Sequence, residues 1–269
     1  MILVDQSPIG RSPRSNPVTY IKAYQDIRSL FAESPEARRA RLTPAYFSFN
    51  TGKGRCHRCQ GNGYEKLEMY FLADLYVPCA DCEGKRFQPK ILNIRVKGYA
   101  IHEVLELTVD QALETFGETC PALRRSLQVL QTLGLGYLRL GQPATSLSGG
   151  ETQRLKIARE LANAPPPSKK GQQTKGILYV LDEPTRGLHL EDVNRLLGVL
   201  GQLVDEGHTV LMVEHHLDVI KCADWVIDLG PGGGESGGHI VAEGPPEDIA
   251  KNPNSITGKY LSPLLAFTK

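Results

Sequence analysis

The sequence lacks two features that would place it in or across a membrane. No apolar run among the 269 residues approaches the length needed to span a bilayer, and residues 1–8 lack the order of basic, apolar and small residues that marks a signal peptide. We therefore expect a cytoplasmic protein with no membrane partner. The composition, 41% hydrophobic and 23% charged residues, is ordinary for a chain that buries one large core or two modest ones.

The sequence also lacks a phosphate-binding loop of the form GxxxxGK[ST]. The nearest look-alike, Gly52-Lys53-Gly54, has neither the spacing nor the hydroxyl. Such a loop supplies the backbone N–H groups and the lysine that hold the β- and γ-phosphates during phosphoryl transfer. We therefore do not expect this chain to hydrolyse ATP by itself.

Acidic residues are scarce in one segment. Residues 38–97 carry 12 Lys and Arg against 5 Asp and Glu, a net charge of +7, whereas the rest of the chain carries −6 and the whole chain +1. A basic surface confined to one segment is typical of a region that meets phosphate groups. A solvated basic face without a partner is the alternative.

Four of the six cysteines form two pairs inside this basic segment. Cys56 and Cys59 make one CxxC knuckle, Cys79 and Cys82 make another, and 19 residues separate the two. Two knuckles at this spacing place four thiolates around one tetrahedral ion, and in a chain without a secretory signal this pattern favours Zn²⁺ over disulfides. Between the knuckles, residues 65–71 alternate polar and apolar side chains, which predicts one arm of a strand pair.

Two further motifs indicate an anion site and a ligand-binding edge of a sheet. Ser148, Gly149 and Gly150 directly precede a predicted helix over residues 152–162, so that backbone N–H groups and the positive end of the helix dipole face an approaching ligand. Residues 177–181 form a short apolar run that predicts a buried parallel strand, with Asp182 and Glu183 at its carboxyl end. Ligands of open α/β sheets bind at that edge.

The remaining elements follow from periodicity and capping signals. Thr108 and Gln111 form a capping box for a helix over 109–116, and the polar, proline-rich residues 164–176 predict a flexible loop. A buried strand over 209–213 would deliver Glu214, His215 and His216. Further helices are expected from Asn16 to Phe31, from Thr119 to about Gly134, over 191–205 and over 246–251, and further strands over 1–4, 91–96, 225–229 and 239–243.

In this order the two motifs resemble the signature loop and the Walker B strand of ABC-type ATPases. The resemblance implies that Asp182 holds Mg²⁺ through water, that Glu183 polarises the attacking water and that His215 bonds the γ-phosphate. It also gives Gln6, after the first strand, the role of the Q-loop residue. Ser148, Gly149 and Gly150 would touch the ATP held by an opposing domain. The fold class implied is a partial α/β ABC-type ATPase domain with a mostly parallel sheet, a helical signature lobe and an inserted zinc-knuckle module.

The inserted knuckles make the chain similar to the C-terminal half of the UvrA family, and in particular to the C-terminal part of its second ATPase domain. The stretches that carry this resemblance are residues 5–17, 47–50, 76–79, 187–189 and 214–220. The family is the excinuclease subunit that recognises DNA damage in nucleotide excision repair. The resemblance implies ATP, Mg²⁺ and Zn²⁺ as cofactors, damaged double-stranded DNA and a UvrB-like protein as partners, and the missing N-terminal half or a second copy to complete the ATP sites.

This resemblance also sets the expected domain boundaries and leaves two functions open. Residues 1–37 would begin the ATPase core, 38–97 form the basic zinc-binding insertion, 98–163 the helical signature lobe, 164–176 the loop, and 177–269 the rest of the core. The chain is then either a portion of an ATP-driven DNA-damage sensor or a zinc-stabilised DNA-binding or interaction module without catalysis. A partner polypeptide that supplies GxxxxGK[ST] would favour the first.

Overall fold

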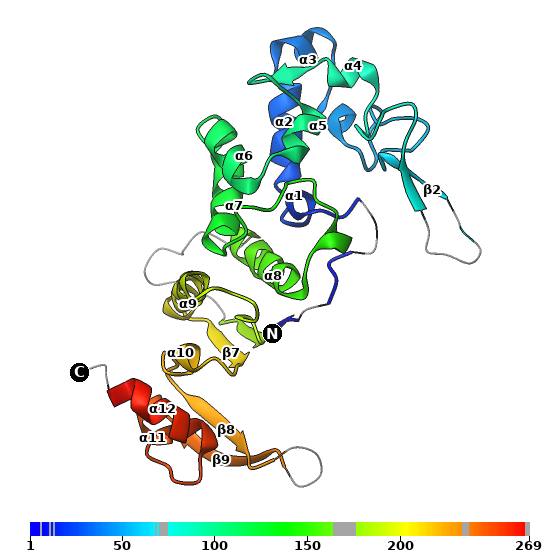
Figure 1. The fold of residues 1–269 in the computed structure, drawn as a ribbon. Coiled ribbons are helices and arrows are strands. Elements are labelled where there is room, and N and C mark those ends of the chain that lie inside the picture. Colours follow the sequence, from blue (N-terminus) through cyan, green and yellow to red (C-terminus); the bar gives the residue numbers. More distant parts are fainter. Residues whose placement is uncertain are drawn as a thin grey trace. The chain divides into compact units, whose positions relative to one another are not determined.

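The computed structural model divides the chain into two compact units (Figure 1). One unit consists of residues 1–3 and 176–269, and the other of residues 4–175. The structure describes residues 1–5, 7–10, 12, 14–67, 69, 75–163, 176–232 and 237–266, so Gln6 and most of the expected loop at 164–176 lie outside the described residues. No helix in the described part of the chain is long and apolar enough to cross a membrane.

The first unit contains a three-stranded sheet in the order β1-β6-β7. Its strands are β1 (Ile2–Val4), β6 (Leu178–Asp182) and β7 (Thr209–Val213). β6 and β7 pair in parallel, so they need a crossover connection, which contains helix α9 (Leu190–Asp205) packed beside β7 (Figure 1). Helix α9 buries one apolar stripe, made of Val193, Leu196, Val199, Leu200 and Leu203.

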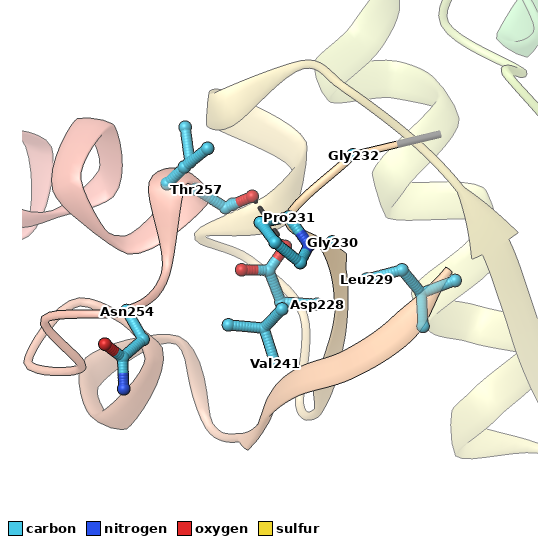
Figure 2. A pocket seen from close by; sticks show the side chains of 9 residues that line it. Asp228, Leu229, Gly230, Pro231, Gly232, Val241, Asn254 and Thr257 are labelled. Atoms are coloured by element: carbon cyan, nitrogen blue, oxygen red, sulfur yellow. Dashed lines mark hydrogen bonds between the residues drawn. The ribbon is translucent and has the colours of Figure 1, made fainter. Parts of the chain in front are cut away.

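The same unit ends in an antiparallel strand pair and short helices. These are α10 (Leu217–Ile220), β8 (Val226–Gly230), β9 (His239–Gly244), α11 (Pro246–Ile249) and α12 (Ile256–Ala266). Both oxygens of the Asp228 carboxylate accept hydroxyl hydrogen bonds, from Ser255 at 2.5 Å and Thr257 at 2.8 Å. This junction fixes the start of α12 against β8 beside a cavity of about 270 Å³ (Figure 2).

The second unit is built mainly of helices. Its amino-terminal part has α1 (Pro17–Tyr20), α2 (Tyr24–Ala32), α3 (Pro35–Arg39) and a 3₁₀ turn η1 (Pro44–Phe47). Asn16 caps α1 and forms a capping box with Thr19, whereas Lys22 adopts a φ of +67° and divides the single helix that the sequence predicts into α1 and α2. An L-residue in that conformation cannot continue a right-handed helix.

The rest of the second unit contains the helical lobe that leads to Ser148, Gly149 and Gly150, which we call the signature motif. It comprises α5 (Ile101–Glu106), α6 (Val109–Phe116), α7 (Pro121–Thr132), the 3₁₀ turn η2 (Ala144–Ser146) and α8 (Gly149–Asn163). The predicted capping box is confirmed, since Thr108 Oγ1 accepts from the N–H of Gln111 and Gln111 Oε1 from that of Thr108. Leu123, Leu127 and Leu130 of α7 are fully buried in the core of this lobe.

The cysteine pairs flank a hairpin, as the sequence predicts. Strands β2 (Tyr64–Leu67) and β3 (Leu75–Pro78) are antiparallel, with Leu67 opposite Leu75. After the second knuckle come α4 (Pro89–Leu92), β4 (Arg95–Val96) and β5 (Tyr99–Ala100). The strand expected over 91–96 is therefore wrong in its first half, because Pro89 at the first helical position starts a helical turn there.

Candidate functional site

The four cysteines of the two knuckles converge on one point. Their sulfurs all lie within 4.8 Å of one another, with Cys56 Sγ 3.9 Å from Cys79 Sγ and Cys59 Sγ 3.6 Å from Cys82 Sγ. A tetrahedral zinc site with Zn–S bonds of about 2.3 Å requires sulfurs about 3.8 Å apart. The spacing, the all-sulfur donor set and the burial of all four residues therefore fit one structural Zn²⁺.

The two knuckles repeat the same backbone path. Each CxxC is followed by two residues in the left-handed region, Gln60 and Gly61 in the first knuckle and Glu83 and Gly84 in the second. The knuckles also bond each other reciprocally: the N–H of Cys56 donates to Arg86 O at 2.8 Å, and that of Cys79 to Gly63 O at 2.9 Å. Gly61 needs its small size, because a Cβ there would lie 2.0 Å from the carbonyl oxygen of Phe49.

Ion pairs also link the two cysteine knuckles to each other and to β2. Arg58 in the first knuckle pairs with Glu65 of β2 at 2.5 Å and with Asp81 of the second knuckle at 3.3 Å. Burial raises the pKa of the Cys82 thiol to about 12, so a thiolate at Cys82 needs a nearby cation to be stable at neutral pH. The N–H of Gly63 points to Cys59 Sγ at 3.3 Å, the kind of contact that stabilises a metal-bound sulfur.

The signature motif begins a long helix. Helix α8 starts at Gly149, three residues earlier than the sequence predicts, so both glycines belong to its first turn. Ser148 precedes it and forms a capping box with Glu151: Ser148 Oγ accepts from the N–H of Glu151 at 3.2 Å, and Glu151 Oε2 accepts from the N–H of Ser148 at 2.7 Å. Tyr137 donates to the other oxygen of Glu151 at 2.5 Å. The loop is thus held from two sides while Ser148 stays exposed.

Glu183 and His215 come together at the carboxyl ends of β6 and β7. Glu183 Oε1 lies 3.6 Å from His215 Nε2, and Glu183 Oε2 lies 3.4 Å from Arg186 Nη1. The N–H of Glu183 donates to Val213 O at 2.9 Å, which continues the ladder one residue past β6. Asp182 is the last residue of β6 and is exposed. The resemblance to ABC-type ATPases implied hydrolytic or Mg²⁺-binding roles for four residues. Asp182, Glu183 and His215 share one edge of the sheet, and Gln6 is outside the described residues.

The sequence interpretation assigned no role to Glu214, which lies between these groups. Its Oε1 accepts from the N–H and the hydroxyl of Thr185 at 3.0 and 2.6 Å, and its Oε2 accepts from the N–H groups of His215 and His216 at 3.0 and 3.4 Å. An acidic residue directly before a histidine, at the end of a strand parallel to the Asp-Glu strand, was the available signal.

The residue before Gln6 is tied to α8. Lys156 Nζ bonds the carboxylate of Asp5, its backbone oxygen at 3.1 Å and the hydroxyl of Ser7 at 2.8 Å. The hydrogen bond from Lys156, with a further one from Ser7, lowers the pKa of Asp5 to about 2. Helix α8 therefore holds the chain on both sides of Gln6.

The basic segment is divided between internal and exposed positions. Arg86 is buried with its guanidinium 5.1 Å from the ring centroid of Phe49, and Arg55 donates to the backbone oxygen of Asn50 at 2.8 Å. Other side chains at the surface also have internal partners: Lys85 with Glu83, Arg95 with Glu103, and Lys97 with the backbone oxygen of Thr115. Part of the +7 charge thus has partners within the fold.

Exposed Lys90 lies beside an aromatic ring, and exposed Lys53 directly precedes Gly54, whose backbone packs on the same tyrosine. Lys90 Nζ is 5.8 Å from the ring centroid of Tyr46, and Gln88 Nε2 donates to the backbone oxygen of Lys53 at 2.9 Å. Gly54 packs so closely on Tyr46 that a Cβ would lie 2.0 Å from its carbonyl oxygen. We call Lys53, Lys90 and Tyr46 the lysine patch.

Comparison with known proteins identifies the family. No model of a known protein family matches the chain. The chain is 58% identical over 261 residues to UvrABC system protein A of Aquifex aeolicus and 54% identical over 266 residues to that of Methanothermobacter thermautotrophicus. These matches cover 97% and 99% of the chain but 27% of each relative, so the chain spans about a quarter of the length of the curated relatives it matches.

A solved structure supports the same family. The crystal structure of UvrA2 from Deinococcus radiodurans superposes with a TM-score of 0.86 and 46% identity, and the match covers 97% of this chain and 31% of that one. The predicted α/β fold with a parallel strand pair is confirmed by this match and by the pairing of β6 with β7. By sequence and by structure, the chain belongs to the UvrA family.

Proposed function

We propose that this chain is the portion of a UvrA-like, ATP-driven DNA-damage recognition subunit that carries the hydrolytic residues of one ATP site, the signature motif of another and a zinc module for DNA. One observation carries the proposal: Glu183 and His215 meet at 3.6 Å on the edge formed by β6 and β7, in a chain matched over 97% of its length by UvrABC system protein A. A carboxylate and an imidazole at the ends of parallel strands suit the γ-phosphate and its attacking water.

Each residue at this edge has a part in the proposed reaction. Glu183 orients and polarises the water that attacks the γ-phosphate, and His215 donates a hydrogen bond to a γ-phosphate oxygen. Asp182, exposed at the strand end, is the residue to hold Mg²⁺ through water; carboxylate oxygens are the donors that this ion prefers. When bound, Mg²⁺ would neutralise phosphate charge. The family resemblance assigns Gln6 the Q-loop role in the same reaction.

The signature motif acts on a second nucleotide in this proposal. The exposed Ser148 and the first turn of α8, with Gly149 and Gly150, offer hydroxyl and N–H donors to the γ-phosphate of an ATP held by an opposing ATPase domain. That domain comes from the remainder of the protein or from a second copy.

The zinc module supplies the DNA contact. We infer that it binds the phosphates of damaged duplex DNA rather than base edges, because a lesion sensor must ignore sequence. The lysine patch suits this role better than Arg55, Arg58, Lys85 or Arg86, which have internal partners. A UvrB-like protein is the expected next partner in repair.

The proposal is tested by supplying what the chain lacks. A polypeptide from the same family that carries GxxxxGK[ST] is mixed with this chain, and steady-state ATP hydrolysis is measured with and without a duplex that contains a lesion. We expect turnover from the mixture and none from either component alone. A matched control replaces the lysine of the GxxxxGK[ST] loop by Ala and should be inactive.

A second function is kept because the sequence contains no GxxxxGK[ST]. A zinc-stabilised module without catalysis would bind the same duplex but show no turnover in the mixture, even when the two polypeptides form a complex. That result would reject the ATPase assignment while leaving the DNA contact in place.

A further inference from the structure

Glu214 connects the two loops that carry the proposed hydrolytic residues. One of its oxygens accepts both donors of Thr185, which lies two residues after Glu183, and the other accepts the N–H groups of His215 and His216. The four donor–acceptor distances lie between 2.6 and 3.4 Å. The side chain therefore bridges the loop after β6 and the loop after β7.

The chemistry of this bridge requires a carboxylate. Four donors converge on two oxygens, and an ionised carboxylate accepts on both and donates on neither. A glutamine of the same shape would turn an NH₂ group, itself a donor, toward one of the two loops. An aspartate is one methylene shorter and could not span the same distance between the loops.

The loop after β6 needs such a restraint. Glu183 adopts a φ of +45°, a conformation that an L-residue with a side chain rarely takes and that persists only when neighbouring contacts fix it. On one side the N–H of Glu183 donates to Val213 O at 2.9 Å, and on the other Glu214 fixes Thr185. These contacts keep Glu183 Oε1 at 3.6 Å from His215 Nε2.

We propose that Glu214 is a positioning residue for ATP hydrolysis, which holds the Glu183 loop and the His215 loop in one geometry. The inference rests on the proposed function, because positioning matters only if Glu183 and His215 act on a nucleotide. Glu214 itself contacts neither the water nor the phosphate in this account. A loop that is free to move by about 1 Å loses much of the rate that alignment provides.

The bridge is tested first in this chain, without nucleotide, by amide hydrogen exchange. Glu214→Gln should raise exchange about tenfold at Thr185, His215 and His216 together, since each loses a charge-assisted acceptor or its restraint. The matched control is Glu206→Gln, an exposed residue of the same unit, which should leave these amides unchanged. Unchanged exchange, or a rise in only one loop, would overturn the bridge.

A second variant guards against a Glu214 substitution that fails to fold. Thr185→Val keeps the shape and the backbone N–H but removes the hydroxyl donor, and it should still raise exchange at His215, across the bridge. Exchange at His215 equal to that of the unmodified chain would count against the proposal.

The consequence for catalysis is read in the mixture with the GxxxxGK[ST] polypeptide. Glu214→Gln should lower kcat at least tenfold and leave KM for ATP within about twofold, because an alignment defect acts on the reaction step. Full kcat with loosened loops would refute positioning while the proposed function stands. If the unmodified mixture has no turnover, the proposed function fails and the positioning role fails with it, whereas the exchange data still decide the bridge.

Discussion

Removal of the proposed zinc ion is the perturbation with the largest expected effect on this structure. Chelation, or Cys79→Ser, would open the site at a residue that is fully buried and whose N–H links the second knuckle to Gly63 of the first at 2.9 Å. Serine keeps the size but is a poor ligand for Zn²⁺.

The size of this effect depends on how much stability the rest of the zinc module provides without the metal ion. Structural Zn²⁺ contributes roughly 10–16 kcal/mol in small zinc modules, comparable to the roughly 5–15 kcal/mol by which a whole domain is stable. The hairpin offers little to replace it, since Leu67 and Leu75 are about half exposed and an isolated two-stranded hairpin is marginal in water. We therefore expect residues 56–86 to unfold locally, while the core around Leu123 and Leu127 of α7 remains folded.

Two measurements check this expectation. Elemental analysis of protein purified without added metal should find about one zinc per chain, and after chelation amide exchange should increase across both knuckles and β2–β3 but not in α7. Gln128→Ala, an exposed change on α7, serves as the control for nonspecific effects of substitution. No bound metal, together with four freely titrating thiols in a chain whose knuckle amides remain protected, would show that no structural metal ion holds the module.

Two further predictions concern charge. Replacing Lys53 and Lys90 of the lysine patch by Ala should weaken binding to damaged duplex DNA and lower the slope of log affinity against log salt concentration by the equivalent of about two phosphate contacts. Lys259→Ala, an exposed change in the other unit, should leave both unchanged. An unchanged salt slope in the double variant would show that the patch is not part of the DNA interface. Because the folded pKa of Asp5 is about 2, below its ordinary value, its contribution to stability is present above about pH 4 and is lost as the pH falls through about 2. Unfolding free energies from denaturant titrations should show this acid loss, and Lys156→Met should remove it; the same loss in both proteins would contradict the assignment.

Local sequence signals predicted much of the fold. The helix over 109–116 and the strand over 209–213 have the predicted bounds, because a capping box marks the first and a β-branched apolar run the second. The strand at 209–213 was expected to be buried, yet Leu211 and Val213 are about half exposed in the described chain. Burial depends on what covers a sheet, which a strand's own residues do not encode. Helix α12 was missed because Pro263 lies inside it.

The site was predicted less completely than the fold. Cysteine spacing alone pointed to the cluster, since ligand geometry restricts which spacings can close around one ion. Glu214 and Lys156 were not found, because each acts through partners 29 and 151 residues away that no local pattern reveals. The basic segment 38–97 was predicted to meet phosphate groups, and only the folded chain shows that Arg55, Arg58, Lys85 and Arg86 also have partners within the module.

In the proposed function, Glu183 drives ATP hydrolysis at a site completed by another polypeptide. The most direct measurement compares ATP turnover and nucleotide binding by this chain, mixed with the GxxxxGK[ST] polypeptide, before and after Glu183→Gln. We predict a fall in kcat of about a hundredfold or more with nucleotide affinity largely retained, because the amide preserves shape but cannot polarise the water. Unchanged turnover in Glu183→Gln, or steady turnover by the unmixed chain, would contradict it.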